Sequence, residues 1–203
     1  MVTIVDYGLG NITSVQKAFE SLGYTCEISS DLAVIESAKI LVVPGQGACG
    51  QAMGQLSKKG LVEPILTHIK QDKPFLGICL GFQILFESSE EDGGIDTLGV
   101  FPGTVKRFQL ENLKVPHMGW NQIDTTETNS DIFRYISSGD NAYFVHSFYV
   151  PETEASSVAT TTDYGVKFVS SVRKGNCFGT QFHPEKSGDI GLNILKGFLE
   201  SVS

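Results

Sequence analysis

A pentapeptide with glycine at both ends and cysteine in the middle, residues 77–81, most constrains how this chain can fold. An apolar run, 74–76, precedes it and a helix-like run, 82–86, follows it. A strand that turns sharply into a helix needs small residues beside the turn, because larger side chains there would collide with the backbone. The thiol of Cys79 would then project at the positive end of a helix, where the thiolate is favoured. The pattern predicts a nucleophile elbow that carries cysteine; the alternative is a buried, inert cysteine, as most free cysteines are.

A cysteine nucleophile needs a base to take its proton, and the sequence offers four histidines. They are His68, His117, His146 and His183. His183 ends the alternating run 177–182 and precedes a proline, which stops a strand ladder. Glu185 could accept a hydrogen bond from one imidazole nitrogen and leave the other to face a thiol, as in a catalytic triad. His68 ends an amphipathic helical pattern, where we expect a solvated or helix-capping role.

Five blocks of sequence carry a resemblance to a known family. Two of them, 77–83 and 182–187, point to the family, and three more, 6–11, 116–121 and 143–149, narrow it. The first two resemble the class I, or triad, glutamine amidotransferases. With the other three, the chain is similar to the family of glutaminase subunits of imidazole glycerol phosphate synthase. Anthranilate and aminodeoxychorismate glutaminases share the first two blocks but not the block Pro-His-Met-Gly-Trp-Asn. The resemblance implies that Cys79, His183 and Glu185 are catalytic.

Strand and helix patterns alternate along the first part of the chain. Apolar strand-like runs at 2–5, 24–28, 40–43 and 75–78 alternate with helical spacing at 12–22, at about 50–69 with an interruption at Gly60, and after Cys79. After Gly103 come short strand patterns at 104–108, 121–124, 141–150, 157–162, 168–173 and 177–182, and then a helix near 190–199. We therefore predict an α/β fold with a doubly wound, mostly parallel sheet flanked by helices and an antiparallel portion in the C-terminal half, in a single glutamine amidotransferase type 1 domain over residues 1–203.

Charge and cysteine content narrow the function classes. A formal charge of −8 with dispersed basic residues argues against nucleic-acid binding. The four cysteines show no CxxC pairing, which argues against a disulfide framework and a zinc site and favours a reducing compartment. No apolar run reaches membrane-spanning length, so we expect a cytoplasmic protein. We expect neither a metal nor an organic cofactor.

The resemblance also assigns residues that surround the nucleophile. Backbone N–H groups of Gly45, Gln46 and Gly47, with that of Leu80, would stabilise the oxyanion of acyl transfer. The family usually has valine where Gln46 stands and often an aromatic residue at position 49, which is cysteine here. The alternative is a simple glycine turn.

Two further side chains would contact the substrate, L-glutamine. Gln83 lies one helical turn after the cysteine, and its amide could hold the α-amino or α-carboxylate group. Ser147 carries over as a second contact, through its hydroxyl or its backbone. His146 could also act as a base, but the family's base matches His183, so we expect His146 to be structural or part of the pocket wall.

The chemistry implied is hydrolysis of glutamine to glutamate and ammonia, and the ammonia needs a recipient. The resemblance supplies a cyclase subunit with a (β/α)8 barrel, forming a heterodimer. The residues that would face it are Asn11, Met118, Trp120, Tyr143 and Lys186. A lone tryptophan beside glycine is usually a core residue, but the resemblance implies that Trp120 lies at the subunit contact, where aromatic anchors are enriched. Two alternatives stay open: a paralogous glutaminase that serves surface-sugar amidination, and a silent assembly subunit.

Overall fold

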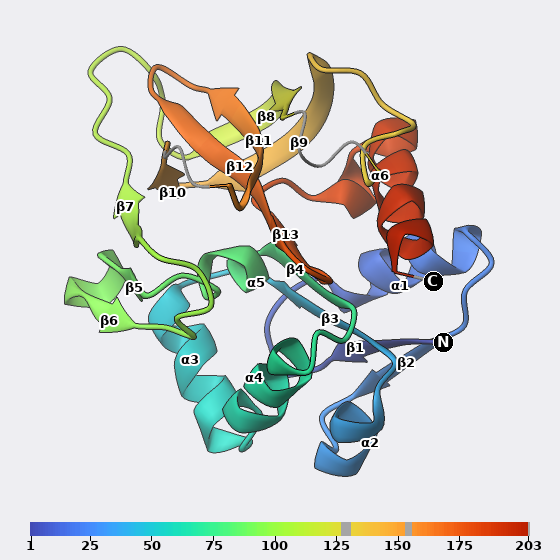
Figure 1. Cartoon of the computed structure of the whole chain (residues 1–203). Helices are drawn as coiled ribbons and strands as arrows, with labels where there is room; N and C mark the ends of the chain where they lie inside the picture. Colours follow the sequence, from blue (N-terminus) through green and yellow to red (C-terminus); the bar gives the residue numbers. More distant parts are fainter. Residues whose placement is uncertain (127–130, 153–155, 203) are drawn as a thin grey trace.

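The structure is a computed structural model that describes residues 1–126, 131–152 and 156–202 (Figure 1). Its first half alternates strands and helices, as the sequence predicts. In chain order these are β1 Val2–Val5, α1 Ile12–Ser21, β2 Cys26–Ser29, α2 Leu32–Ser37, β3 Ile40–Gly45, α3 Cys49–Lys58, α4 Val62–Lys70, β4 Phe75–Cys79 and α5 Leu80–Gln83. Strands β2, β1, β3 and β4 lie side by side in that order, and each pair of neighbours is parallel.

Helices cover both faces of these parallel strands, which explains why the strands are apolar without interruption. Leu41 and Val43 of β3 belong to one hydrophobic cluster with buried residues of α3 and α4. Val42 belongs to another, with buried residues of α1 and of the last helix, α6 (Gly188–Ser201). This follows from strand geometry, since successive side chains point to opposite faces. Figure 1 shows α1 and α6 on one side of the strands and α3 and α4 on the other, the doubly wound arrangement.

The second half of the chain adds the antiparallel portion. Its strands are β5 Ser88–Ser89, β6 Ile95–Asp96, β7 Thr104–Arg107, β8 His117–Thr125, β9 Asp140–His146, β10 Phe148–Pro151, β11 Val158–Asp163, β12 Lys167–Lys174 and β13 Cys177–Thr180. Strand β13 joins the two portions, because it pairs in parallel with β4 and antiparallel with β12. Strand β12 also pairs antiparallel with β10 and β11, β11 with β8, and β8 with β9.

Several elements differ from the sequence-based prediction, including the short strands β5 and β6, which were not predicted. Helix α2 was not predicted, because its six residues are too few to show a repeating apolar pattern. The helix is capped by the Asp31 side chain, which accepts hydrogen bonds from two backbone N–H groups at its start. The predicted strand 141–150 divides into β9 and β10 at Ser147. The helix after Cys79 is a single turn, because the segment 98–101 donates to the carbonyl groups of residues 84–86 that a longer helix would use.

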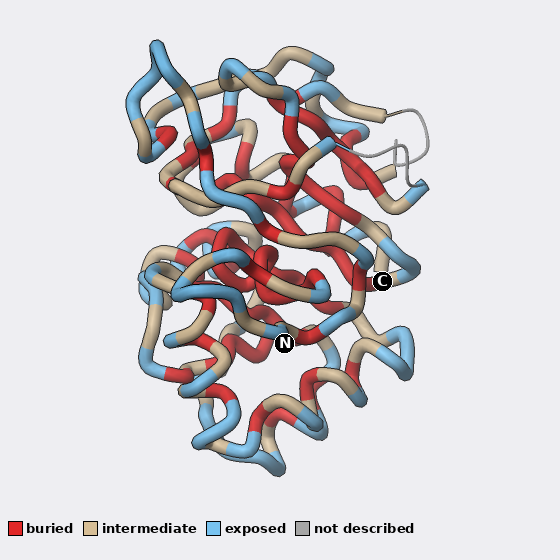
Figure 2. The backbone as a smooth tube through the Cα atoms, turned by 90° about the vertical axis from the view of Figure 1, so that its left-hand side faces the viewer, coloured by how far each residue is buried: buried red, intermediate tan, exposed pale blue. Residues whose placement is uncertain are grey.

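Buried residues follow the strands through the middle of the molecule, and exposed residues lie mostly on the surrounding helices and loops (Figure 2). The helices in the described part of the chain are all too short or too polar to cross a membrane. Strands β3, β4 and β13 are adjacent and parallel, so their carboxyl ends meet at one edge of the sheet. This is the edge at which an open α/β sheet binds its ligands.

Candidate active site

Cys79 ends strand β4 in a backbone conformation that non-glycine residues rarely adopt, with φ 55° and ψ −99°. The flanking glycines allow this turn. A Cβ atom at Gly77 would lie 2.5 Å from the carbonyl oxygen of Gly81, and one at Gly81 would overlap the carbonyl oxygen of Val43. Because strained non-glycine conformations persist only where the surroundings fix them and often lie in active sites, the turn makes Cys79 a candidate functional residue. The predicted elbow is present, although the single turn of α5 limits the helix dipole at the thiol.

His183 and Glu185 form a buried pair beside this thiol. The imidazole Nδ1 lies 2.8 Å from Glu185 Oε1, and each side chain is 2% exposed. The backbone fixes the ring's position, since the N–H of His183 donates to the Tyr143 carbonyl at 2.9 Å and its own carbonyl accepts from the Ser187 hydroxyl at 2.7 Å. The structure thus holds a histidine and its orienting carboxylate in one geometry.

The electrostatics of this pair favour a charged imidazole. Burial opposes the charge on His183, but the nearby sulfur of Cys79 and the carboxylate of Glu185 outweigh it, and the pKa of His183 rises well above its ordinary value. The Nε2 atom of His183 has no hydrogen-bond partner among the residues that the structure describes. A nitrogen that faces a thiol and is otherwise unused can exchange a proton with it or with a bound substrate.

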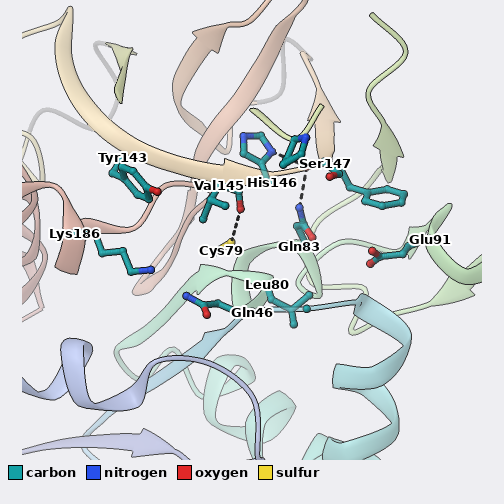
Figure 3. A pocket seen from close by; sticks show the side chains of 13 residues that line it. Gln46, Cys79, Leu80, Gln83, Glu91, Tyr143, Val145, His146, Ser147 and Lys186 are labelled. Carbon is teal, nitrogen blue, oxygen red and sulfur yellow. Dashed lines mark hydrogen bonds between the residues drawn. The ribbon is translucent and has the colours of Figure 1, made fainter. Parts of the chain in front are cut away.

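A pocket of about 410 Å³ opens over the thiol (Figure 3). Of the residues predicted from sequence, its lining contains Gln46, Gly47, Cys79, Leu80, Gln83, Ser147, Tyr143 and Lys186. Figure 3 shows Cys79 in the middle, with Tyr143 and Lys186 on one side and Glu91 on the other. The size is in the range of small-molecule sites and suits an amino acid.

The predicted oxyanion segment lies directly beside the elbow. Gly45 is the last residue of β3 and is the register partner of Cys79 in β4. Gly47 has a φ of 112°, a conformation that favours glycine, so its backbone departs from the strand. Leu80 is the first residue of α5. Gln46, Gly47 and Leu80 therefore line the same pocket as the thiol, and strand pairing holds Gly45 beside Cys79.

Gln83 lies in the pocket wall with its amide engaged by the protein. Its Nε2 donates to the Phe148 carbonyl at 2.9 Å and to Gln181 Oε1 at 3.0 Å, and its Oε1 accepts from the Cys49 thiol at 3.6 Å. Burial raises the pKa of Cys49 to about 12, so this thiol remains a donor. These contacts tie α5 to β10 and to the end of β13, and Gln181 in turn reaches Cys79 Sγ at 3.7 Å.

His146 belongs to a hydrogen-bond chain that leaves it no free ring nitrogen. Its Nδ1 donates to the Phe148 carbonyl at 2.7 Å, which leaves Nε2 to accept from Nδ1 of His117 at 2.9 Å. Asn121 then donates to the remaining nitrogen of His117 at 3.3 Å. Burial lowers the pKa of His146 to about 3 and that of His117 to about 4, so both rings are neutral. This supports the expected structural role for His146.

Sequence reasoning missed Glu91 and misplaced His68. The acidic run 90–92 had the pattern of a solvated loop, yet Glu91 lines the pocket and its Oε2 accepts from the N–H of Cys49, at the start of α3, at 2.7 Å. Nothing in the local pattern distinguishes it from its acidic neighbours. His68, expected to be solvated or to cap its helix, is 2% exposed, and its Nε2 lies 2.9 Å from the Pro74 carbonyl oxygen, beyond the end of that helix. The helix end turns inward there, against the start of β4.

The residues predicted to face a partner lie at the Tyr143 side of the pocket. Met118 and Trp120, on β8, are 63% and 58% exposed, so Trp120 is not a core residue. Trp120 is the register partner of Tyr143, whose ring meets it edge-on, and the Lys186 ammonium lies 5.9 Å from the centre of the Tyr143 ring. Asn11 caps α1, and α1 contacts the turn Pro184–Lys186.

Comparison with known proteins agrees with this geometry. The family model described as glutamine amidotransferase class-I matches residues 3–201. The imidazole glycerol phosphate synthase subunit HisH of Syntrophotalea carbinolica is 52% identical, over 98% of each chain. The HisH subunit of Rhodopirellula baltica is 49% identical, over 98% of this chain and 96% of the relative. A solved structure described as glutamine amidotransferase shares the fold with a TM-score of 0.76 at 17% identity, over 99% of this chain and 98% of the other. The chain therefore belongs to the class-I glutamine amidotransferases and, within them, to the family of HisH subunits of imidazole glycerol phosphate synthase.

Proposed function

We propose that this chain hydrolyses L-glutamine at Cys79 and passes the ammonia to a cyclase subunit in histidine biosynthesis. The observation that carries the proposal is the buried His183–Glu185 pair beside the thiol of Cys79. This thiol lines the pocket and stands on a strained turn. HisH relatives at 49–52% identity over nearly the whole chain support this pathway over a paralogous amidination pathway. The intact side chains of the three residues argue against a silent assembly subunit.

The reaction would proceed through a thioester. The sulfur of Cys79 attacks the carboxamide carbon, the C–N bond breaks, and His183 gives its proton to the departing ammonia. Water then attacks the thioester, loses a proton to His183, and releases glutamate as the sulfur leaves. Glu185 keeps the imidazole oriented and stabilises its positive charge. No step requires a metal or an organic cofactor.

The negative oxygen of each tetrahedral intermediate needs hydrogen-bond donors. We assign this role to the N–H of Leu80 and to backbone N–H groups of the segment 45–47, because both border the thiol. Glycine at both ends of that segment lets its peptides change orientation at little cost. An off state and an on state of the enzyme would then differ in the direction of one peptide group.

Glutamine would lie with its α-ammonium group toward Glu91 and its carboxamide over the thiol. Glu91 is the carboxylate in the pocket lining, on the side away from Tyr143. Ser147, where β9 gives way to β10, offers its backbone and hydroxyl to the α-carboxylate. Gln83 has its amide engaged in the pocket wall, so we assign it to positioning the wall and to substrate contact through Oε1.

Ammonia would leave on the side of Tyr143 and Lys186, toward a (β/α)8 barrel cyclase bound as a heterodimer. The exposed aromatic and thioether groups of Trp120 and Met118 suit an anchor in such an interface. Asn11, capping α1 near the same turn, would complete the contact. We further propose that residues 1–203 act as one glutamine amidotransferase domain in the cytoplasm.

Kinetics of cysteine variants would test the proposal. Glutamine hydrolysis is measured in the complex with the cyclase and imidazole glycerol phosphate, and also for the isolated chain, for which we expect a low rate. Cys79→Ala should abolish glutamine hydrolysis while the complex still makes product from added ammonia. Cys26→Ala, at the start of β2 and remote from the pocket, is the matched control and should keep wild-type activity. Hydrolysis that persists in Cys79→Ala would refute the assignment.

A further inference from the structure

Tyr7 carries a hydroxyl group that the fold buries without using. Its side chain is fully buried, and its hydroxyl oxygen has no hydrogen-bond partner among the residues that the structure describes. A buried hydroxyl without a partner destabilises the fold, whereas phenylalanine would fill the same space with no polar atom. The hydroxyl at this position therefore calls for a partner in another conformation of the site.

The hydroxyl lies against the first residue of the oxyanion segment. A Cβ atom placed on Gly45 would overlap it, and the same Cβ would lie 2.9 Å from Cβ of Leu80. On another side, a Cβ on Gly10 would lie 3.1 Å from the Gly45 Cα atom. Gly45 is thus enclosed by a phenol, a leucine and a glycine backbone. Burial, and then the nearby sulfur atoms of Cys79 and Cys49, raise the pKa of Tyr7, so its oxygen keeps its proton and can donate.

The donor matters because of how a peptide group turns. The function proposed above assigns the oxyanion to backbone N–H groups of the segment 45–47, and of these we take the N–H of Gln46, a residue that lines the pocket, to point at the substrate's carbonyl oxygen during the reaction. The N–H and C=O of one planar peptide point in opposite directions, so turning this N–H into the pocket turns the Gly45 carbonyl oxygen away from it. A carbonyl turned into the protein needs a hydrogen-bond donor. The hydroxyl beside Gly45 is an unused donor in the right place.

We propose that Tyr7 is a positioning residue for the oxyanion segment: its hydroxyl donates to the Gly45 carbonyl oxygen when the Gly45–Gln46 peptide presents its N–H to the substrate. The bond is made in the reacting conformation and is missing in the conformation described here. Tyr7 therefore lowers the free energy of the reacting conformation relative to the other. It does so without touching glutamine.

Replacing Tyr7 with phenylalanine removes only the hydroxyl and is the direct test. In the complex with the cyclase and imidazole glycerol phosphate, Tyr7→Phe should lower kcat for glutamine roughly five- to tenfold, the effect of one hydrogen bond, and leave KM unchanged. The melting temperature of the isolated chain should stay the same or rise, because an unpartnered polar group is gone. Tyr135→Phe, which removes a tyrosine hydroxyl bonded to Glu200 far from the pocket, should keep wild-type kcat.

The combination of a lower kcat with an undiminished melting temperature separates positioning from a packing role. Wild-type kcat in Tyr7→Phe would overturn the inference, as would a fall in kcat accompanied by a lower melting temperature or a higher KM. Cys79→Ala is assayed alongside. If Cys79→Ala still hydrolyses glutamine, the proposed function itself fails; if Cys79→Ala is inactive and Tyr7→Phe equals wild type, only the role of Tyr7 fails.

Discussion

Two histidines beside the pocket have opposite protonation states, and their neighbours explain why. His183 faces the Cys79 sulfur and the Glu185 carboxylate, which raise its pKa against the effect of burial. Burial, and then the neighbouring imidazoles of His117 and His183, lower the pKa of His146 to about 3, although its hydrogen bond to the Phe148 carbonyl acts in the opposite direction. His183 follows a strand-like run and His146 lies within one, so the local pattern separates them only through Glu185, two residues after His183. Only the partners that the fold brings to each ring decide which one can act as a base.

The neutral pair His117 and His146 predicts a loss of stability in mild acid. The pKa of His117 falls from its ordinary 6.5 to about 4 in the folded chain, so below pH 6.5 the unfolded chain binds the extra proton first. This contribution is present above pH 6.5 and is lost as the pH falls toward 4. His117→Asn keeps a donor for His146 but removes the titrating group, and we expect it to be about 1–2 kcal/mol less stable at pH 7.

The measurement is the free energy of unfolding of both proteins by urea, at steps between pH 7.5 and 4. Other titrating groups are present in both proteins, so their contributions cancel in the difference. His183, which follows β13 and lowers the pKa of His146, is one of these shared groups. The difference between wild type and His117→Asn should shrink as the pH falls through this window. A difference that stays constant would show that His117 does not titrate as the structure requires.

At the scale of the elements, the strand order does most to assemble the site. Strands β3, β4 and β13 are adjacent and parallel, so their carboxyl ends deliver residues 45–47, Cys79 and His183 to one edge although long stretches of chain separate them. The pocket is also lined by Ser147, which lies between the end of β9 and the start of β10. The turn between β4 and α5 packs closely against β3, since a Cβ atom at Gly81 would overlap the Val43 carbonyl oxygen.

Gly81→Ala tests that tight contact. Its Cβ would overlap the Val43 carbonyl oxygen, a backbone atom that cannot move aside, so we expect a loss of about 2 kcal/mol or more in stability together with loss of glutamine hydrolysis. Gly54→Ala is the control: the position is exposed within α3, no atom lies within 4 Å of the added Cβ, and a helix gains about 0.5–1 kcal/mol from alanine there. Equal melting temperatures for the two variants would contradict the packing of the elbow.

At the scale of the whole molecule, sequence patterns predicted the layers and the reacting groups better than the walls of the site. The run 77–81 and the block around His183 identify the elbow and the base because their backbone requirements are local. Glu91 and Tyr7 could not be found in this way. Their roles depend on which distant backbone each one meets, the start of α3 for Glu91 and the end of β3 for Tyr7. Apolar periodicity records burial but carries no signal for such contacts.

Every step of the proposed reaction depends on Cys79 being the nucleophile that attacks glutamine. The most direct test treats the complex with a glutamine-analogue electrophile and maps the modified residue by mass spectrometry while activity is followed. We predict an adduct on Cys79 and none on Cys26, Cys49 or Cys177, formed in proportion to the loss of activity and slowed by added glutamine. Activity lost without modification of Cys79, or glutamine hydrolysis that continues after Cys79 is fully modified, would contradict the assignment of Cys79 as the nucleophile.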